Sequence, residues 1–445
     1  MNKGAQNAVF FNSRQLLFVA DVEFCLTHFD QAWHRDFYRL PKQHRTTILA
    51  YNDPVEKCRG RKMFDLTVVG GGMVGASIAA YMAQQGWQVA LVEAQQPEPY
   101  DANQPADLRV SAISQRSQQW LEQSGAWQAV AAMRFCPYRR LQAFERPEQS
   151  VEFHAASINQ SELGHIVENR LLQLACWQQF PQSLQLFCPA RVIALQQDAD
   201  SAQLTLDNGD CLHSRLVIAA DGARSALRQL AGIGTRGWRY AQGCLVAHVV
   251  TELPQQDVTW QQFTETGPKA FLPLPGQQGS LVWYDHLPKV QQLAGLSPAA
   301  LSQAMMAAFP AQLGNIEVQR ATWFPLQRLH ALSYYQQRLV LVGDAAHAIH
   351  PMAGQGVNLG FADAALLCQL LQQAGVAALE QPQALLARYQ QQRQPQNWLM
   401  MSGMDALYQG FGSRSPLVRQ LRQLGLALAG RSNLLKKLVT RYATG

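Results

Sequence analysis

A glycine-rich turn between a strand pattern and a helix pattern constrains this chain more than any other feature. The turn spans residues 70–75, Gly-Gly-Gly-Met-Val-Gly, and follows the apolar segment 64–69. Strand, turn and helix in this order are the context that a GxGxxG match requires. Gly70 permits the tight turn, Gly72 lets the backbone approach a pyrophosphate, and Gly75 allows close helix packing. The pattern predicts an α/β, Rossmann-like domain that holds a dinucleotide at a helix N-terminus. The alternative is a turn of purely structural use.

A second strand pattern, residues 87–92, ends at an acidic residue. Glu93 follows Gly70 by 23 residues, at the position where a carboxylate accepts both hydroxyls of an adenosine ribose. A carboxylate at this position argues against a bound 2′-phosphate. We therefore expect Glu93 to contact the cofactor.

Two further strand patterns end in polar residues. Segment 215–221 ends at Asp221, and segment 338–344 ends at Gly343 and Asp344. Open α/β sheets bind ligands at the carboxyl ends of their strands, so these ends are expected to converge on one cofactor. Asp344 is placed to accept a ribityl hydroxyl of a flavin.

A loop and a helix pattern follow Asp344. Residues 351–358 read Pro-Met-Ala-Gly-Gln-Gly-Val-Asn and lead into the helix pattern 359–371. Free N–H groups at such a helix start stabilise the negative charge of a reduced flavin. The expected flavin-edge residues are Pro351, Gly354, Gln355 and Gly356, with Asn358 as a further cofactor contact.

Together these motifs resemble the single-component flavin aromatic hydroxylases, over residues 63 to about 430. Segments such as Arg-Val-Ser-Ala-Ile-Ser at 109–114 are similar to the ubiquinone-biosynthesis branch. The resemblance implies FAD, NAD(P)H as a transient reductant, and O₂ that forms a C4a-hydroperoxyflavin. It also implies a polyprenyl benzoquinol substrate, Arg109 near the FAD, and the 351–356 turn beside the isoalloxazine ring.

The patterns divide the chain into an extension and three regions. We expect a discontinuous FAD-binding domain, a β-rich substrate domain, and a basic amphipathic helical tail, at residues 63–234 with 331–400, 235–330 and 401–445. The segment 109–121 is predicted to be a helix. Aromatic residues of the substrate domain are candidates for an apolar pocket, namely Trp260, Phe263, Phe271, Trp283, Tyr284 and Trp323.

Residues 1–62 do not match the rest of the chain. They show no sustained apolar period and carry ten Lys and Arg against six Asp and Glu. Targeting presequences are poor in acidic residues, so a mis-assigned start before Met63 is favoured over a presequence. We expect this extension to be disordered or dispensable.

Charge and ligand spacing exclude other classes. Residues 398–445 carry seven basic residues against one acidic residue, whereas the middle of the chain is slightly acidic. Nucleic-acid binding is therefore not expected. The basic tail fits peripheral contact with anionic lipid or, alternatively, packing or an oligomer contact. No metal is expected: Glu162 and His165 form only one of the two Glu-x-x-His pairs that a di-iron site needs.

Three functional hypotheses follow. The first is a flavin hydroxylase that acts on the ring of a polyprenyl benzoquinol, in the cytoplasm or peripheral to the inner membrane. Its alternative is a hydroxylase of another ring position in the same pathway. The second is an NAD-dependent dehydrogenase that uses only the first motif, against which Asp221 and Asp344 argue. The third is a flavoprotein scaffold of a biosynthetic protein complex.

Overall fold

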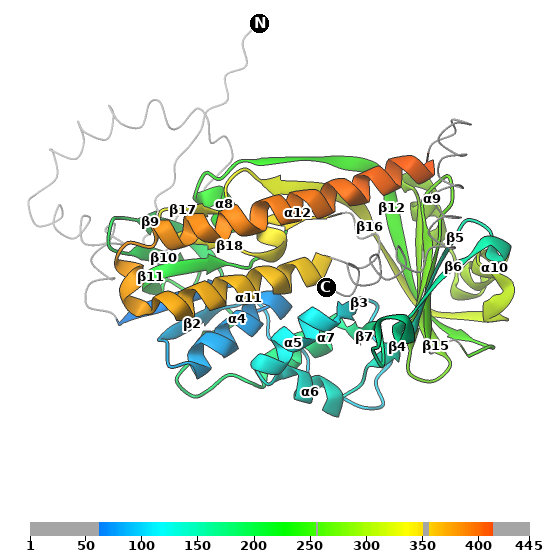
Figure 1. Cartoon of the computed structure of the whole chain (residues 1–445), viewed down its shortest axis with the longest axis horizontal. Coiled ribbons are helices and arrows are strands. Elements are labelled where there is room, and N and C mark those ends of the chain that lie inside the picture. The colour runs from blue at the N-terminus through cyan, green and yellow to red at the C-terminus, as the bar shows by residue number, and fades with distance from the viewer. Residues whose placement is uncertain (1–61, 255–256, 350–355, 413–445) are drawn as a thin grey trace, which may run out of the picture. The chain divides into compact units, whose positions relative to one another are not determined.

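Two eight-stranded sheets dominate the computed structural model, which describes residues 62–254, 257–349 and 356–412 (Figure 1). Most of the expected extension lies outside the described residues. So do Pro351, Gly354 and Gln355, and the tail from residue 413.

The first sheet is mainly parallel. Its order is β17-β18-β11-β1-β2-β8, and β1 pairs in parallel with both β2 and β11 while β11 pairs in parallel with β18. The carboxyl ends of β1, β2, β11 and β18 therefore share one edge, as expected for ligand binding. The strands are β1 (Met63–Val69), β2 (Val89–Val92), β8 (Gln185–Phe187), β9 (Val192–Gln197), β10 (Ala202–Leu206), β11 (Cys211–Ala219), β17 (Tyr335–Gln336) and β18 (Leu339–Leu341). Strands β9, β10 and β11 form two consecutive antiparallel pairs at the side of this sheet.

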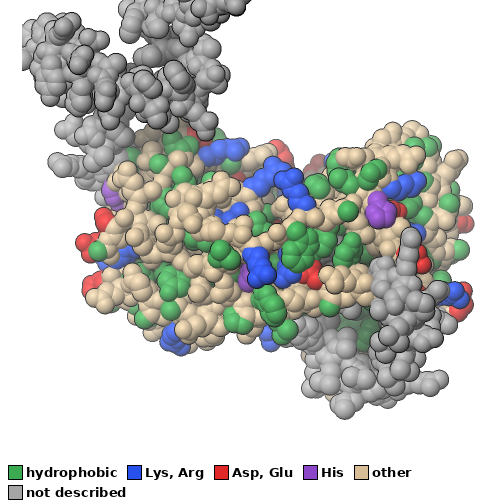
Figure 2. Space-filling view, turned by 90° about the horizontal axis from the view of Figure 1, so that it is seen from above, with side chains coloured by type: hydrophobic (Ala, Val, Ile, Leu, Met, Phe, Trp, Pro, Cys, Tyr) green, Lys and Arg blue, Asp and Glu red, His purple; other side chains and the backbone are tan. Residues whose placement is uncertain are grey.

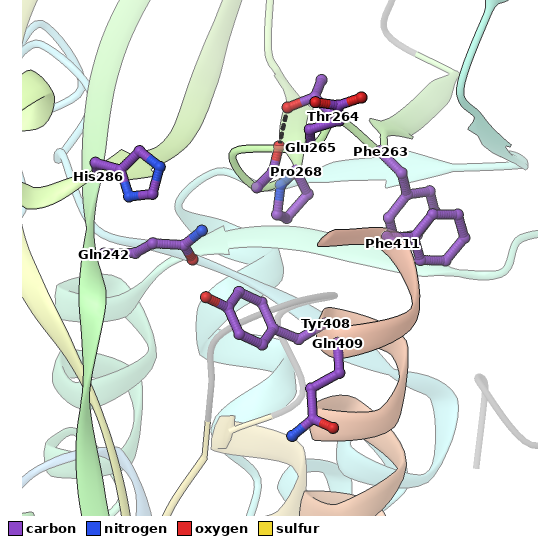
Figure 3. A pocket seen from close by; sticks show the side chains of 10 residues that line it. Gln242, Phe263, Thr264, Glu265, Pro268, His286, Tyr408, Gln409 and Phe411 are labelled. Carbon is purple, nitrogen blue, oxygen red and sulfur yellow. Dashed lines mark hydrogen bonds between the residues drawn. The ribbon is translucent and has the colours of Figure 1, made fainter. Parts of the chain in front are cut away.

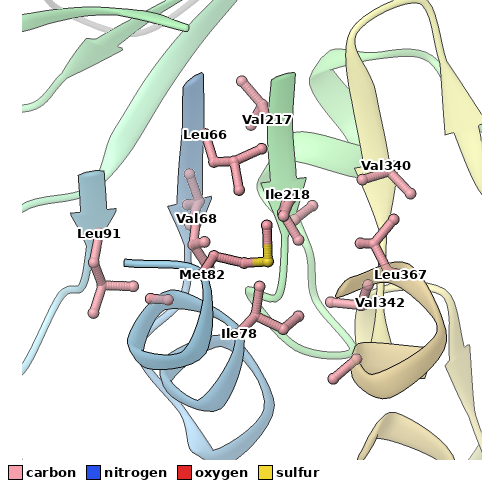
Figure 4. Packing of buried hydrophobic residues seen from close by; sticks show 14 of the residues in the cluster. Leu66, Val68, Ile78, Met82, Leu91, Val217, Ile218, Val340, Val342 and Leu367 are labelled. Atoms are coloured by element: carbon pink, nitrogen blue, oxygen red, sulfur yellow. The ribbon is translucent and has the colours of Figure 1, made fainter. Parts of the chain in front are cut away.

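Helices α4 (Met73–Gln84) and α11 (Gly356–Ala374) pack against this sheet (Figure 4). Leu66 and Val68 of β1 meet Ile78 of α4, and all three are fully buried. Each such side chain contributes about 1.5–3 kcal/mol relative to exposure. This core fixes the helix N-termini beside the strand ends.

The second sheet has the order β19-β16-β12-β15-β14-β13-β5-β6. Its strands are β5 (Arg140–Phe144), β6 (Val151–His154), β12 (Thr235–Thr251), β13 (Val258–Gln262), β14 (Lys269–Leu274), β15 (Gln278–His286), β16 (Ile316–Ala331) and β19 (His347–Ala348). Helices α9 (Leu287–Ala294) and α10 (Pro298–Ala308) cover one face and enclose Trp260, Phe271 and Trp283 in a separate core. These three aromatic residues are therefore core residues, and both helices were missed by the strand-like interpretation of residues 235–330.

A small third sheet corrects one expectation. The segment 109–121 is not one helix, because Val110–Ser114 forms strand β3 and α5 (Gln115–Gln123) begins only afterwards. β3 pairs with β7 (Gly164–Glu168), which also pairs with β4 (Cys136–Tyr138). Ser114 ends the strand and its hydroxyl caps α5 by accepting from the Ser117 N–H. Helices α6 (Ala126–Ala132) and α7 (Asn169–Trp177) follow.

Helix α12 (Gln383–Gly412) runs from the first sheet toward the second (Figure 1). The expected boundary at residue 400 falls inside it, and β5 and β6 join the second sheet although they lie in the range expected for the FAD-binding domain. The proposed domain division stays a prediction. The remaining short helices are η2 (Pro147–Gln149), η3 (Ala155–Ile158), α8 (Ala226–Leu230), η4 (Ala311–Leu313), η5 (Gly343–Ala345) and η7 (Val376–Glu380).

Candidate functional site

The glycine turn forms an open cradle between β1 and α4. Gly70 has a left-handed φ of 102°, and a Cβ on Gly75 would lie 1.9 Å from the Gly70 carbonyl oxygen. A Cβ on Gly72 would meet nothing within 4 Å. Two glycines thus close the turn, while the third faces free space at the α4 N-terminus. This space and these N–H groups fit a pyrophosphate.

Glu93 and two residues of α7 hold the middle of the turn. One Glu93 oxygen accepts from the Gly71 N–H, and the other accepts from the Gln95 N–H at 3.0 Å. Gln173 Nε2 and Trp177 Nε1 both donate to the Gly71 carbonyl at 2.8 Å. Each carboxylate oxygen can accept a second bond, so Glu93 keeps capacity for ribose hydroxyls. Gln173 and Trp177 were not identified from the sequence, since nothing local links them to a turn about a hundred residues earlier.

The second part of the site is the turn after β18. Gly343 has a φ of 57°, and a Cβ on Gly360 of α11 would lie 3.4 Å from the Gly343 Cα, so the turn lies directly against α11. Asp344 stays accessible to water. Burial among protein atoms nevertheless raises its pKa, while the charges of His347 and Arg109 partly lower it. A carboxylate that is accessible to water and closely surrounded by protein atoms suits a hydroxyl-bearing ligand.

Arg109 immediately precedes β3, and its charge acts on Asp344. The chain before it is clamped by two other arginines. Arg134 pairs with the buried Glu168 at 2.6 Å and donates to the Gln104 and Pro105 carbonyls, while Arg170 bonds Asp107 at 2.9 Å. No local sequence signal indicates this clamp, because Arg134 and Arg170 lie 29 or more residues from the residues that they hold.

Asp221 follows β11, at the same edge of the sheet. One of its oxygens accepts from the Leu227 N–H of α8 at 3.2 Å, and the other is buried without a partner among the described residues. Burial raises the pKa of Asp221. The residue is therefore engaged with α8 through one oxygen only, and its role as a cofactor contact stays a prediction.

Asn358 joins α11 to the third sheet. Its Oδ1 accepts from the Ser114 N–H at 3.0 Å and from the Ser117 hydroxyl at 2.8 Å, and its Nδ2 donates to the Ala112 carbonyl at 2.8 Å. These bonds place the N-terminus of α11, which begins at Gly356. Of the expected flavin-edge residues, only Gly356 lies in the described part of the chain.

One buried acid was missed entirely. Asp363 of α11 is fully buried and bonds both Gly343 and His347, on either side of Asp344. The signal for it was present, because Asp363 is the one charged residue inside the apolar helix pattern 359–371. A carboxylate in such a position requires buried partners.

An apolar face of the second sheet lies opposite the face that α9 and α10 cover. It carries Cys244, Val246, Val282 and Tyr284, all buried. Near its end a cavity of about 440 Å³ opens between this sheet and the last turns of α12 (Figure 3). It is lined by Gln242, Phe263, Thr264, Glu265, Gly267, Pro268, His286, Tyr408, Gln409 and Phe411. Of the six expected pocket aromatics, Phe263 lies in this cavity and Tyr284 on the apolar face.

Neither a metal-binding group nor a membrane-spanning helix is found among the described residues. Within residues 62–254, 257–349 and 356–412, no group of three His, Cys, Asp or Glu side chains is arranged to hold a metal ion. Glu162 Oε1 lies 3.5 Å from His165 Nε2, as a single pair. The helices of the described chain include none with the length and hydropathy of a membrane span.

Comparison with known proteins agrees with the site. Residues 63–403 match the family model described as FAD binding domain. The chain is 45% identical over 386 residues to 3-demethoxyubiquinol 3-hydroxylase of Escherichia coli, covering 86% of this chain and 98% of that protein. It is 35% identical over 388 residues to the ubiquinone hydroxylase UbiL of Rhodospirillum rubrum, covering 86% and 90%.

Solved structures show the same fold at lower identity. PqsL of Pseudomonas aeruginosa, a probable FAD-dependent monooxygenase, matches with a TM-score of 0.70 at 21% identity, covering 82% of this chain and all of that one. The p-nitrophenol 4-monooxygenase PnpA of Pseudomonas putida matches with a TM-score of 0.70 at 17% identity, covering 86% and 99%. The glycine cradle, the exposed Asp344 carboxylate and these matches agree, and the chain belongs to the FAD-dependent monooxygenases that carry this FAD binding domain.

Proposed function

We propose that this protein hydroxylates the ring of a polyprenyl benzoquinol in ubiquinone biosynthesis, with O₂ as co-substrate and NAD(P)H as transient reductant. The observation that carries the proposal is the 45% identity to the Escherichia coli 3-demethoxyubiquinol 3-hydroxylase over 98% of that protein. The mitochondrial ubiquinone biosynthesis monooxygenase COQ6 of Homo sapiens is also similar, at 29% identity over 435 residues.

The residues of the chain have binding and shielding roles in this proposal. Bound FAD would activate O₂ and supply one oxygen atom to an electron-rich ring. The glycine cradle holds the pyrophosphate, Glu93 the ribose, and Asp344 the ribityl chain. Arg109 supplies a positive charge beside Asp344. Positioning and exclusion of water are the contributions that a protein makes to such chemistry.

The quinol ring is proposed to lie on the apolar face of the second sheet. Val246, Val282 and Tyr284 offer a flat apolar wall there. Ile349 and Leu359, which flank the flavin-edge segment in sequence, pack with Met401 of α12. Apolar walls with few polar groups suit a flat ring. Of the expected flavin-edge residues, Gly356 is the one within the described chain, and it begins α11 three residues before Leu359.

The test is oxygen consumption and product mass with purified full-length protein and FAD. A short-chain demethoxyubiquinol should stimulate oxygen uptake with NADH or NADPH, and the product should gain one oxygen atom. Hydroxylation only of a quinol that lacks a different ring oxygen would move the assignment to a sister reaction. A protein that binds FAD but consumes no oxygen in response to any of these quinols would favour a scaffold role in a biosynthetic complex.

Peripheral membrane contact is proposed as well, since the substrate is a lipid. The face that carries β12 and α12 shows hydrophobic and basic side chains next to one another (Figure 2). Trp238, Trp398 and Leu399 are 45%, 54% and 60% exposed, and the exposed Arg236 and Arg239 of β12 flank Trp238. Trp with flanking basic residues is typical of proteins that lie on anionic lipid.

Vesicle sedimentation tests this contact. Binding to vesicles that contain phosphatidylglycerol should fall at high salt, and after Trp398→Ser with Leu399→Ser. Replacement of Arg419, Arg422, Lys436 and Lys437 by Gln tests the tail in the same assay. Ile193→Ser is the matched control, because Ile193 is 58% exposed on β9. Equal binding by all variants would refute lipid contact through either surface.

A further inference from the structure

Asp363 is a carboxylate in the middle of the main hydrophobic core. It lies on α11 between Phe361 and Ala364, which are buried in the core of the first sheet, and is itself 0% exposed. Removing an ionised carboxylate from water costs several kcal/mol unless close partners compensate. The partners of Asp363 therefore indicate why a charge is retained at this position.

Four donors surround the two oxygens of Asp363. Oδ2 accepts from the Gly343 N–H at 3.0 Å and from His347 Nε2 at 2.5 Å. Oδ1 accepts from Arg393 Nε at 2.6 Å and from Asn397 Nδ2 at 3.1 Å. Burial alone would raise the pKa of Asp363, but the charges of His347 and Arg393 and their hydrogen bonds outweigh it and lower the pKa to about 2. The group is thus ionised and its acceptor capacity is fully used.

The two donors on Oδ2 come from opposite ends of one short turn. Gly343 opens η5 and His347 opens β19, and Asp344 lies between them. One carboxylate oxygen thereby fixes both ends of the segment that presents Asp344. The Gly343 N–H has Asp363 as its acceptor, so the left-handed turn at Gly343 is tied to the buried carboxylate. Asp363 is held in turn by α12 through Arg393 and Asn397.

From this geometry we propose that Asp363 is a positioning residue for the cofactor: it sets the direction in which Asp344 faces the flavin ribityl chain. The inference rests on the FAD site of the proposed function but not on the identity of the substrate. Its consequence is that FAD affinity depends on a residue that is buried behind the turn and reaches the cofactor only through Asp344.

A purely structural ion pair is the rival explanation, and it predicts a different result. A stabilising pair would affect unfolding and FAD affinity only through the amount of folded protein. A positioning residue would affect FAD affinity through Asp344, so the two residues would be energetically coupled. A double-mutant cycle with FAD binding as the readout separates these explanations.

The cycle uses Asp363→Asn and Asp344→Asn in the full-length protein, with FAD binding followed by flavin fluorescence on apoprotein. Asp363→Asn should raise the Kd for FAD about tenfold or more in the otherwise native protein, but less than threefold in the Asp344→Asn background. Ser302→Ala is the matched control, because Ser302 is a buried hydroxyl of α10 that accepts from the Val318 N–H. It should lower stability and leave the Kd unchanged.

A second variant covers the case in which Asp363→Asn does not fold. Asp363→Asn with Arg393→Met removes the carboxylate and the guanidinium of this pair together, so the arginine charge is not left unpaired in the core. This protein should unfold at a urea concentration near that of the native apoprotein and still bind FAD about tenfold more weakly. A native Kd in either folded variant, or an equal loss with and without Asp344, would overturn the inference. Quinol hydroxylation is not part of this readout, so the result is independent of the proposed reaction.

Discussion

At the scale of single residues, the three glycines of the cradle have separable roles. Gly72 has an ordinary φ of −67° and free space around its Cβ position, so Gly72→Val should change apoprotein stability by less than about 0.5 kcal/mol yet abolish FAD binding. Gly75→Ala should cost at least about 1–3 kcal/mol, because its Cβ would overlap the Gly70 carbonyl. Urea unfolding of the two apoproteins and FAD titration check this. Gly72→Val protein that still binds FAD would disprove the pyrophosphate site.

His330 should make stability depend on pH. Burial, together with the charges of His347 and Arg328, lowers its pKa to about 4, and its Nε2 lies 2.9 Å from the Tyr334 hydroxyl. The unfolded chain therefore takes up a proton on this residue before the folded protein does. Stability should fall as pH drops from about 6.5 to 4, by an amount on the order of 1 kcal/mol for this half-buried group.

The comparison that isolates His330 is with His330→Gln. This variant keeps a hydrogen-bonding side chain but does not titrate, so its urea midpoint should change less between pH 6.5 and 4.5 than that of the native protein. His165 and His248, whose pKa values burial also lowers, contribute equally to both proteins. Parallel pH profiles would show that the His330 pKa is not lowered in the folded state.

Some site residues could be predicted from the sequence because their chemistry is local. Gly72 and Asp344 each lie in a short motif whose strand and helix context is visible nearby. Asp363 and Trp177 have no such motif: they act on Gly343 and Gly71, which are 20 and 106 residues away. Only the folded chain brings such partners together. A charged residue inside an apolar helix pattern nevertheless indicates a buried charge with polar partners, and Asp363 shows this pattern.

At the scale of elements, the buried Asp405 side chain attaches α12 to strands β16 and β12. Asp405 accepts from Arg328 of β16 and from the Tyr240 hydroxyl of β12, and both ion-pair side chains are at most 11% exposed. Asp405→Ala leaves the Arg328 charge unpaired, which should cost about 3 kcal/mol. Amide exchange in residues 398–412 should accelerate, while FAD affinity should stay unchanged because the cradle is not touched.

An exposed ion pair provides the control for this prediction. Arg140 and Asp257 lie 2.7 Å apart but are 37% and 45% exposed. Arg140→Ala should cost less than about 1 kcal/mol. Equal losses in Asp405→Ala and Arg140→Ala would mean that the Asp405 bonds do not hold α12.

Helices and strands could be predicted where the hydrophobic pattern was long, and the prediction was wrong where the pattern was short. The helix expected over 359–371 lies within α11, whose apolar period is sustained. The helix predicted over 109–121 is wrong at residues 110–114, because five residues cannot distinguish the helix period from the strand period. The pairing partner of this strand, β7, lies about 50 residues further on. Long-range pairing therefore overrode the local pattern.

At the scale of the whole molecule, the turn after β18 that carries Asp344 connects the two large sheets. β18 belongs to the first sheet, and β19, which begins six residues after β18 ends, pairs with β16 of the second through His347 and His330. The apolar wall proposed for the quinol ring is thus joined through β16 to the segment that presents Asp344. The sequence suggested an inserted layer, but not that β5 and β6 would join it.

A protein that starts at Met63 tests whether residues 1–62 are needed for folding and FAD binding. β1 begins at Met63 and is paired on both sides, with β2 and with β11. A protein that starts at Met63 should therefore fold, bind FAD with the native Kd and turn over quinol at the native rate. FAD at a hundredfold excess over its Kd should stabilise both forms by about 2.7 kcal/mol, because only the folded state binds it. Thermal unfolding with and without FAD measures this directly. If the shortened protein aggregates, or gains less stability from FAD than the full chain, residues 1–62 contribute to the cofactor domain and their interpretation as dispensable is wrong.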